Sequence, residues 1–215
     1  MTGDGRVKYP RTPHLPWSGG IEPDDTVLPA LDQLRAAAEV VVTEKLDGEC
    51  TTIGPGGWSH ARSLDTAPHP SRSSVRALAG RIGHEIPPGY RICGENLYAV
   101  HSIAYEALAD HFQVFNVWAG ASCLSWDDTE VWTGALGLVT VPVLYRGPMP
   151  DRAGLEQCWR AGTAGRDSEG YVVRDAAAFP RDEFGLRVAK YVRPGHVQTS
   201  EHWLAQEPRV NGLRP

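Results

Sequence analysis

Apolar residues occur along this chain in short runs, and clusters of Gly and Pro separate one run from the next. The chain holds 23 Gly and 17 Pro, and such clusters are typical of turns between short strands. The β-branched run 40–44 predicts a strand, and residues 50–53 and 57–62 predict a hairpin that turns at 54–56. Alternating or clustered apolar residues predict further strands at 90–97, 112–118, near 139–145, 169–174 and 186–192.

Apolar residues at helical spacing predict helices between these strands. The predicted helices are 28–39, 71–86, 126–137, a segment near 152–161 and, close to the end of the chain, 196–205. Residues 1–26 are rich in Pro, Gly and Asp and are predicted to be irregular. Antiparallel-looking strands with interspersed helices indicate an α+β fold. The 215 residues fit a single domain over 1–215 with one substantial core.

The composition narrows the class of protein. No apolar run approaches the roughly 20 residues that a membrane span needs, and the first residues lack the apolar stretch of a signal peptide. We therefore expect a cytoplasmic protein without membrane contact. The formal net charge is −5. Taken alone, this charge argues against a nucleic-acid-binding protein, which usually carries a basic surplus.

The counts of Lys, Cys and His restrict the chemistry. Lys occurs only three times against 18 Arg, as Lys8, Lys45 and Lys190. A GC-rich genome explains most of this bias, but Arg cannot replace a nucleophilic amine. The four Cys lie 30 or more residues apart, and the eight His show no metal-ligand spacing. A structural zinc site is therefore not expected.

The segment Glu44-Lys45-Leu46-Asp47-Gly48 overlaps the end of the first predicted strand. Alternation along a strand places Lys45 and Asp47 on one face, and Gly48 permits a turn or the close approach of a phosphate. A Lys beside carboxylates becomes a nucleophile when nearby cations lower its pKa. The other interpretation is an exposed Lys in a solvated charge cluster, and this short motif alone does not decide between them.

Charged residues also interrupt apolar strands further along the chain. Arg62 ends the predicted hairpin, Glu95 lies inside a strand, Glu169 precedes one, and Lys190 lies in the last predicted strand. A charge in such a place is costly unless it is paired, metal-bound or lined by solvent. Each of these residues alone is more simply explained as part of a structural ion pair, but their order along the chain favours a shared site.

That order resembles the covalent nucleotidyltransferase superfamily of ATP-dependent ligases and mRNA capping enzymes. EKLDG resembles motif I, HARS motif Ia, CGEN motif III, FQVFNVW motif IIIa, EGYVVR motif IV and VAKYVR motif V. The segments KYPRTPHLPWS, GENLYAVHSI and AKYVRPGHVQTSEHW are similar to the RNA ligase 2-like family. The resemblance implies an α+β nucleotidyltransferase (ATP-grasp-like) fold of packed antiparallel β-sheets flanked by helices. Because only 25 residues follow Lys190, no OB-fold domain is expected.

The resemblance implies ATP-dependent joining of RNA 3′-hydroxyl and 5′-phosphate ends in three steps. Lys45 would attack the α-phosphate of ATP, form a lysyl-AMP phosphoramidate and release pyrophosphate. AMP would then move to the RNA 5′-phosphate, and a 3′-hydroxyl would attack that activated end. Attack at phosphorus needs charge neutralisation more than acid–base catalysis, and Mg²⁺ or Mn²⁺ would supply it. RNA repair is the expected role, with an RNA end-healing enzyme as the expected protein partner.

The resemblance also implies roles for individual residues. The expected catalytic residues are Lys45, Asp47 and Lys190. The expected ATP-binding residues are Glu44, Lys45, Arg62, Glu95, Phe115, Glu169 and Lys190, with Phe115 stacked on adenine and Glu44 at its amino group. Glu169 and Glu95 would bind the metal. The expected RNA or phosphate contacts are Arg72, Arg76, Arg187 and Arg193. A core position for Phe115 and a solvated face for the helix arginines are the alternatives.

The chain departs from the family pattern at three positions. Cys50 stands where relatives often carry Asn, and a thiol cannot replace an amide as a hydrogen-bonding group. Val188 stands where some RNA ligases carry a second motif V Lys, and Asn116 replaces a common Asp of motif IIIa. The Cys50 difference leaves the metal hydration scheme open.

Two other functions fit the same motifs. One is a DNA ligase or a GTP-using capping enzyme, although these usually carry an OB-fold domain after motif V. The other is a catalytically inactive RNA-binding module that retains the fold. Cys50 is the only residue that favours the inactive module, and the charged residues of motifs I, III, IV and V argue against it.

Overall fold

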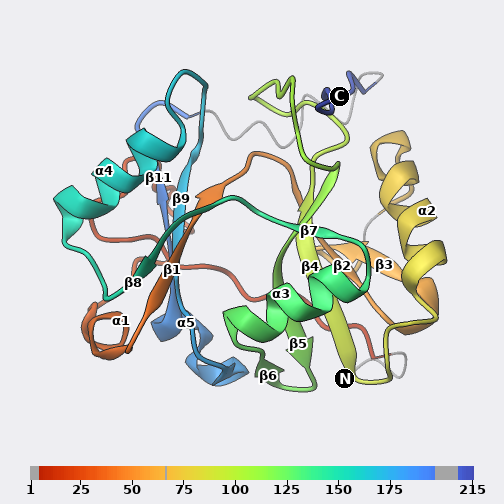
Figure 1. Ribbon diagram of the computed structural model, residues 1–215, viewed down its shortest axis with the longest axis horizontal. Coiled ribbons are helices and arrows are strands. Elements are labelled where there is room, and N and C mark those ends of the chain that lie inside the picture. Colours follow the sequence, from red (N-terminus) through yellow and green to blue (C-terminus); the bar gives the residue numbers. More distant parts are fainter. Residues whose placement is uncertain (1–4, 66, 197–207) are drawn as a thin grey trace.

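Two sheets stand side by side in the computed structural model, which describes residues 5–65, 67–196 and 208–215 (Figure 1). The four-stranded sheet has the order β11-β9-β1-β8, and all its pairings are antiparallel. The seven-stranded sheet has the order β10-β6-β5-β4-β2-β3, with β7 running parallel to β5. The strands are β1 (Val40–Lys45), β2 (Glu49–Ile53), β3 (Ser59–Ala61), β4 (Tyr90–Asn96), β5 (Phe112–Ala119), β6 (Ser122–Cys123), β7 (Val139–Thr140), β8 (Val143–Gly147), β9 (Gly170–Asp175), β10 (Phe179–Pro180) and β11 (Val188–Val192).

Helices flank the two sheets (Figure 1). The helices are α1 (Asp32–Ala36), α2 (Ser73–Ile82), α3 (Trp126–Ala135), α4 (Arg152–Gly162) and α5 (Phe184–Arg187), with short 3₁₀ turns η1 (Pro55–Gly57), η2 (Pro70–Arg72) and η3 (Arg181–Glu183). Leu34 of α1 and Leu155 of α4 share one apolar cluster with the four-stranded sheet, and α2 shares another with the seven-stranded sheet. None of the helices in the described ranges is long and apolar enough to cross a membrane.

Alternation along the strands turns different side chains toward the other sheet. In β1, Val40 and Val42 belong to the outer cluster with α1 and α4. Val41 packs in a separate cluster that includes Leu97, just after β4, and contacts Phe115 of β5. Because successive strand residues point to opposite faces, Lys45 shares the inner face with Val41. Burying the apolar outer face against helices thus leaves the polar ends of the strands to line the space between the sheets.

The structure confirms the predicted α+β fold of antiparallel sheets, and it corrects two predicted elements. The strand predicted near 139–145 divides at Pro142 into β7 and β8, which join different sheets; a proline cannot donate a hydrogen bond to a ladder. The helix predicted at 28–39 shrinks to α1. Leu28 is held instead by the backbone of His14, since its N–H donates to the His14 carbonyl at 2.7 Å.

Other differences are at the boundaries. The strand predicted from residue 186 begins at Val188, because residues 184–187 form α5. The two-residue strands β6 and β10 are too short to produce an alternating pattern and were not predicted. The predicted helix 196–205 lies outside the described residues except for its first position.

Two glycines are required by close backbone packing near the ends of strands. A Cβ on Gly170 would lie 1.9 Å from the Tyr191 carbonyl oxygen, and one on Gly48 would lie 2.6 Å from that of Asn96. Neither distance is possible for a real side chain. Gly48 therefore allows a close approach to a neighbouring strand, which is a different reason from the turn or phosphate contact predicted from the sequence.

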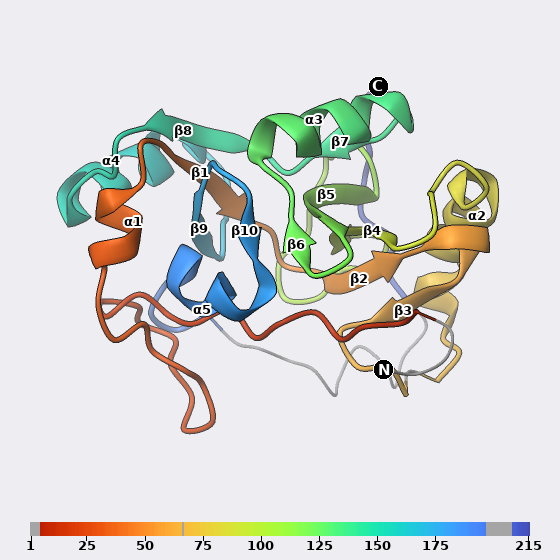
Figure 2. The same cartoon turned by 90° about the horizontal axis from the view of Figure 1, so that it is seen from below.

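The N-terminal arm crosses beneath both sheets (Figure 2). The ring of Tyr9 meets those of Phe115 and Phe184 edge-on, at centroid distances of 5.3 and 5.4 Å. Further along, Leu15 N–H donates to the Lys190 carbonyl at 2.7 Å, and Lys190 N–H donates to the Pro13 carbonyl at 2.8 Å. The irregular arm thus lies along β11 and fixes the backbone of Lys190.

Candidate active site

A cavity of about 650 Å³ opens between the two sheets. It is lined by most of the residues that the sequence singles out: Glu44, Lys45, Asp47, Arg62, Arg72, Glu95, Phe115, Glu169 and Lys190. Arg76, Arg187 and Arg193 are not part of this lining. Residues up to 146 positions apart therefore meet in one cavity because the two sheets turn their inner faces toward each other.

Lys45 lines the cavity from the end of β1. The register of β1 against β9 sets Lys45 opposite Gly170, which brings Glu169 beside it. Lys45 Nζ donates a hydrogen bond to Glu169 Oε2 at 2.6 Å. Burial alone would lower the pKa of Lys45, but the carboxylates of Glu169, Glu95 and Asp47 outweigh it and hold that pKa above its usual value. The amine is therefore an ammonium in the unliganded protein.

Glu95 reaches the cavity from the opposite sheet, where it pairs across β2–β4 with Cys50. Burial raises the pKa of Glu95 to about 8; Lys45 opposes this rise, and Glu169 and Asp47 add to it. Burial also raises the pKa of the Cys50 thiol well above its usual value. The wall that faces Lys45 thus presents a carboxyl group that binds a proton near neutral pH and an uncharged thiol.

Asp47 is fixed by the loop that follows β4. Its Oδ2 accepts hydrogen bonds from Ser102 N–H at 2.8 Å, from Ser102 Oγ at 2.7 Å and from Ile103 N–H at 2.7 Å. Its backbone N–H donates to the Tyr105 hydroxyl at 2.8 Å. One carboxylate oxygen is therefore occupied by the protein, and Oδ1 remains directed elsewhere.

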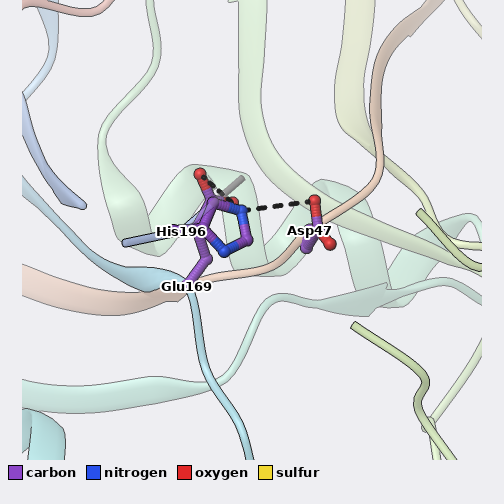
Figure 3. Close-up of side chains that lie close together, drawn as sticks. All are labelled: Asp47, Glu169 and His196. Carbon is purple, nitrogen blue, oxygen red and sulfur yellow. Dashed lines mark ion pairs between the residues drawn. The ribbon is translucent and has the colours of Figure 1, made fainter. Parts of the chain in front are cut away.

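His196 faces the second oxygens of two carboxylates (Figure 3). Its Nε2 lies 3.7 Å from Asp47 Oδ1 and 3.7 Å from Glu169 Oε1. The three side chains each offer one metal-ligand atom, and these atoms lie within 4.8 Å of one another. His196 is not among the residues that the sequence predicts for the site, because no other ligand residue stands near it in the sequence at a recognisable spacing.

Lys190 has an acidic neighbour that the sequence did not reveal. Its Nζ lies 3.6 Å from Asp25 Oδ1, and His14 Nε2 lies 3.0 Å from Asp25 Oδ2. Burial and the charge of Lys45 lower the pKa of Lys190, while Asp25 opposes that shift. Burial and Lys190 lower the pKa of His14 to about 4. His14 is therefore neutral at pH 7, and its Nδ1 lies 2.7 Å from Ser18 Oγ.

Glu44 lies on the other face of β1 from Lys45. Both of its oxygens accept hydrogen bonds from the Arg166 guanidinium, one of them at 2.6 Å. The Glu44 side chain is fully buried. This contact occupies the carboxylate in the unliganded protein, and the predicted adenine contact stays a prediction.

Phe115 and Arg62 occupy the seven-stranded wall. Phe115 is partly exposed to the cavity, although its ring also packs against Tyr9. Arg62 is partly exposed and forms no hydrogen bond or ion pair with the described residues. Asn116, the residue that departs from the family pattern, accepts a hydrogen bond from Arg174 at 2.6 Å and donates one to the Tyr9 hydroxyl at 2.6 Å. This amide joins the arm to both sheets.

The four arginines predicted to bind RNA fall into different environments. Arg72 pairs with both oxygens of Glu49 and is largely buried. Arg187 contacts Asp175 at 2.7 Å and Glu183 at 2.8 Å. Arg76 is exposed on α2, and the Nε of Arg193 donates to a backbone carbonyl at 3.0 Å. The structure does not bring these four residues together.

The sequence model of the RNA ligase family matches residues 38–192, which is more than half of the chain. The chain belongs to the RNA ligase family. The match spans the segment in which Lys45, Glu95, Glu169 and Lys190 line the cavity. A comparison of this RNA ligase family chain with the curated proteins finds no match.

Solved structures share the fold of this RNA ligase family member. An archaeal ATP-dependent RNA ligase aligns with a TM-score of 0.55 at 17% identity, over 86% of this chain and 48% of that one. A variant of Naegleria gruberi RNA ligase determined with ATP and Mn aligns with a TM-score of 0.50 at 16% identity, over 76% and 52%. A putative ATP-dependent DNA ligase from Aquifex aeolicus gives 0.51 at 20% identity, over 84% and 50%. The chain spans about half the length of these proteins.

Proposed function

We propose that this chain is an ATP-dependent RNA ligase domain in which Lys45 becomes covalently adenylylated. One observation carries the proposal: the Lys45 amine is 2.6 Å from Glu169 in a cavity that Glu95 and Lys190 also line. These residues stand in the segments that resemble motifs I, III, IV and V, in a member of the RNA ligase family. The archaeal and Naegleria proteins of similar fold bear RNA ligase names.

In the proposed first step, Lys45 Nζ forms a bond to the α-phosphorus of ATP, and the bond from that phosphorus to the bridging oxygen of pyrophosphate breaks. The amine must first lose a proton, because an ammonium has no lone pair. In the unliganded protein three carboxylates hold the pKa of Lys45 up. Neutralising these carboxylates is therefore the condition for the reaction.

Lys190 and Arg62 are the residues that would hold the phosphates. The N-terminal arm holds the backbone of Lys190 by two hydrogen bonds, and Asp25 lies beside its amine. Lys190 is thereby positioned at the cavity wall. Arg62 enters from the facing sheet. Positive charges on both sides of the cavity suit a triphosphate, whose developing charge in the transition state must be balanced. Phe115 would supply an aromatic surface for adenine on the same wall as Arg62.

The donor set fits a divalent cation. Asp47, Glu95 and Glu169 offer hard carboxylate oxygens, the ligands that Mg²⁺ and Mn²⁺ accept. The pKa of Glu95 is about 8, owing first to burial and then to its carboxylate neighbours; this crowding of negative charge is what a bound cation would relieve. When bound, Mg²⁺ or Mn²⁺ would neutralise charge at these carboxylates and at the phosphates. The Naegleria protein determined with ATP and Mn is consistent with this requirement.

The second and third steps would use RNA ends. AMP would pass from Lys45 to a 5′-phosphate, and a 3′-hydroxyl would displace AMP to form the new phosphodiester. The chain spans about half the length of its structural neighbours. We propose that it joins RNA ends in RNA repair and that an RNA end-healing enzyme is its partner.

The test is covalent labelling. Incubation of the purified chain with α-³²P-labelled ATP and Mg²⁺ or Mn²⁺ should label the wild type, and Lys45→Arg should lower the labelling by at least ~10⁴-fold, since Arg keeps the charge but is no nucleophile. Lys8→Arg is the matched control and should label as the wild type does. Equal labelling of wild type and Lys45→Arg would contradict the assignment.

Substrate assays separate the two ligase classes. A nicked RNA duplex and a nicked DNA duplex of the same sequence should be compared with the adenylylated protein. Sealing of the RNA nick supports the proposal. Sealing confined to DNA would favour the DNA ligase alternative. The observation behind that alternative is the similar fold of the putative ATP-dependent DNA ligase from Aquifex aeolicus.

A further inference from the structure

The best-defined group of ligand atoms in the described residues contains a histidine. The His196 side chain is 2% exposed, and its Nε2 lies 3.7 Å from one oxygen of Asp47 and 3.7 Å from one oxygen of Glu169. Figure 3 shows the imidazole between the two carboxylates. A buried imidazole at equal distances from two acidic oxygens is a mixed nitrogen and oxygen donor set.

In both Asp47 and Glu169, one carboxylate oxygen accepts hydrogen bonds from the protein and the second oxygen faces His196. Asp47 Oδ2 accepts three hydrogen bonds from residues 102 and 103, and Glu169 Oε2 accepts one from Lys45. The oxygens left over are Asp47 Oδ1 and Glu169 Oε1, and these are the two that face His196. A further polar contact of the imidazole joins its Nε2 to Ser102 Oγ at 3.4 Å.

We propose that His196 is a nitrogen ligand of the divalent cation that Asp47 and Glu169 hold, and that it shifts the preference of this site from Mg²⁺ toward Mn²⁺. The proposal rests on the proposed function only in placing the cation in the same cavity. It adds a residue and a metal preference that the carboxylates alone do not give.

The distances suit direct ligation. Two donor atoms that each lie about 2.0–2.2 Å from one first-row ion are at most about 4.4 Å apart. The nitrogen and each oxygen are 3.7 Å apart, and all three atoms lie within 4.8 Å of one another. Small rotations of the side chains therefore suffice to bring them around one ion.

The identity of the third ligand decides the metal preference. Mg²⁺ is a hard cation that retains water and selects oxygen ligands. An imidazole nitrogen is better matched to first-row transition ions. A site of two carboxylates and one imidazole should therefore bind Mn²⁺ more tightly relative to Mg²⁺ than the same carboxylates without the imidazole.

The experiment measures Mn²⁺ binding to the full chain without ATP. Pulsed electron paramagnetic resonance of the Mn²⁺-bound wild type should show modulation from a directly bound ¹⁴N nucleus. His196→Gln should lose this modulation and weaken Mn²⁺ binding by ~10-fold or more, while Mg²⁺ binding, measured by competition, should change by less than ~3-fold. His101→Gln is the matched control, because His101 also lines the cavity but is not one of the three ligand residues; it should retain the modulation.

Two results would overturn the proposal: ¹⁴N modulation that persists in His196→Gln, or Mn²⁺ bound to the wild type without such modulation. A second variant, His196→Asn, and circular dichroism of both variants distinguish a lost ligand from a lost fold. Covalent labelling by ATP is scored separately. If His196→Gln loses the ¹⁴N modulation but the wild type never forms lysyl-AMP, this inference is supported and the proposed function is wrong. If the wild type forms lysyl-AMP but its bound Mn²⁺ shows no ¹⁴N modulation, the proposed function is supported and this inference is wrong.

Discussion

The two walls of the cavity differ in how their charges are balanced. On the four-stranded sheet, Lys45 contacts Glu169 at 2.6 Å and Lys190 lies 3.6 Å from Asp25. On the seven-stranded sheet, Arg72 pairs with Glu49, whereas Glu95 and Arg62 form no ion pair with any described residue. The four-stranded wall therefore holds its amines in place before a ligand arrives, and the facing wall presents a carboxyl group that is largely protonated at pH 7, Glu95, and a guanidinium without an ion pair, Arg62.

This difference follows from topology. The register of β1 against β9 brings Lys45 beside Glu169, and the N-terminal arm, which lies along β11, brings Asp25 beside Lys190. No such register exists between the two sheets, because they are not hydrogen-bonded to each other at these strands. Preorganised charges reduce the reorganisation needed during a reaction. We infer that the four-stranded wall fixes the reacting amine and that the seven-stranded wall is completed by nucleotide and metal.

The largest expected effect concerns Glu95 and pH. The pKa of Glu95 is about 8 in the folded protein, against an ordinary value of 4.5. Between these values the folded state binds more protons than the unfolded state, so the free energy of unfolding should fall as the pH rises from 4.5 through 8, by several kcal/mol at most. Glu95→Gln should remove this slope. Urea unfolding at pH 5, 6.5 and 8 measures it.

His14 provides an internal check on that measurement. Its pKa falls to about 4, first through burial and then through Lys190. A base with a lowered pKa stabilises the fold above its ordinary value of 6.5, and this contribution is lost as the pH falls toward 4. His14 is present in the wild type and in Glu95→Gln, so it cancels in their difference. Parallel curves for the two proteins would show that Glu95 is not the unbalanced group.

The next effect separates the paired wall from the unpaired one at constant pH. Glu169→Gln removes the carboxylate nearest to Lys45 and leaves a largely buried ammonium less well compensated. At pH 7 we expect it to lower the free energy of unfolding by about 1–3 kcal/mol. Glu95→Gln should change it little or raise it, since Glu95 is largely protonated there. Equal losses would remove the distinction between the walls.

Part of this arrangement could be predicted from the sequence. Strand alternation and the order of the motifs depend on local patterns, and they sufficed to select Lys45, Glu95, Glu169 and Lys190 as neighbours. The structure adds that two of these residues, Lys45 and Glu169, are in direct contact.

The other part depends on contacts between distant loops. Asp25 meets Lys190, and Arg166 meets Glu44, across more than 120 residues; an irregular arm and a loop after a helix show no periodicity that predicts such contacts. The sequence also treats Arg76 and Arg187 as equivalent. Only the positions of Asp175 and Glu183 show that Arg187 has acidic partners.

A smaller effect is expected from Asp25, which supports Lys190. Asp25→Asn should leave Lys190 without its carboxylate neighbour and slow lysyl-AMP formation by roughly 10-fold, the equivalent of about 1.4 kcal/mol. Asp24→Asn is the matched control, because Asp24 is 70% exposed and pairs with Arg11. Single-turnover labelling with α-³²P-ATP measures both rates. If Asp25→Asn reacts as fast as the wild type, the arm contributes to the fold but does not position the amine.

The smallest effect concerns RNA binding on the two sides of the molecule. Arg76 is exposed on α2 beside the seven-stranded sheet, whereas Arg187 of α5 is compensated by Asp175 and Glu183. An Arg that contacts a phosphate adds to the salt dependence of binding because it releases a counterion. Arg76→Ala should therefore weaken RNA binding by a few-fold and reduce the slope of log affinity against log salt by about 0.7–0.9.

Arg187→Ala should leave both the affinity and the slope unchanged, because its guanidinium is already neutralised by two carboxylates. Fluorescence anisotropy with a labelled 5′-phosphorylated RNA, over a series of salt concentrations, measures each variant. If Arg187→Ala weakened binding as much as Arg76→Ala, the acidic partners would have to release Arg187 when RNA binds. The four-stranded side would then have to rearrange when RNA binds, and the contrast between the two walls would apply to ATP binding alone.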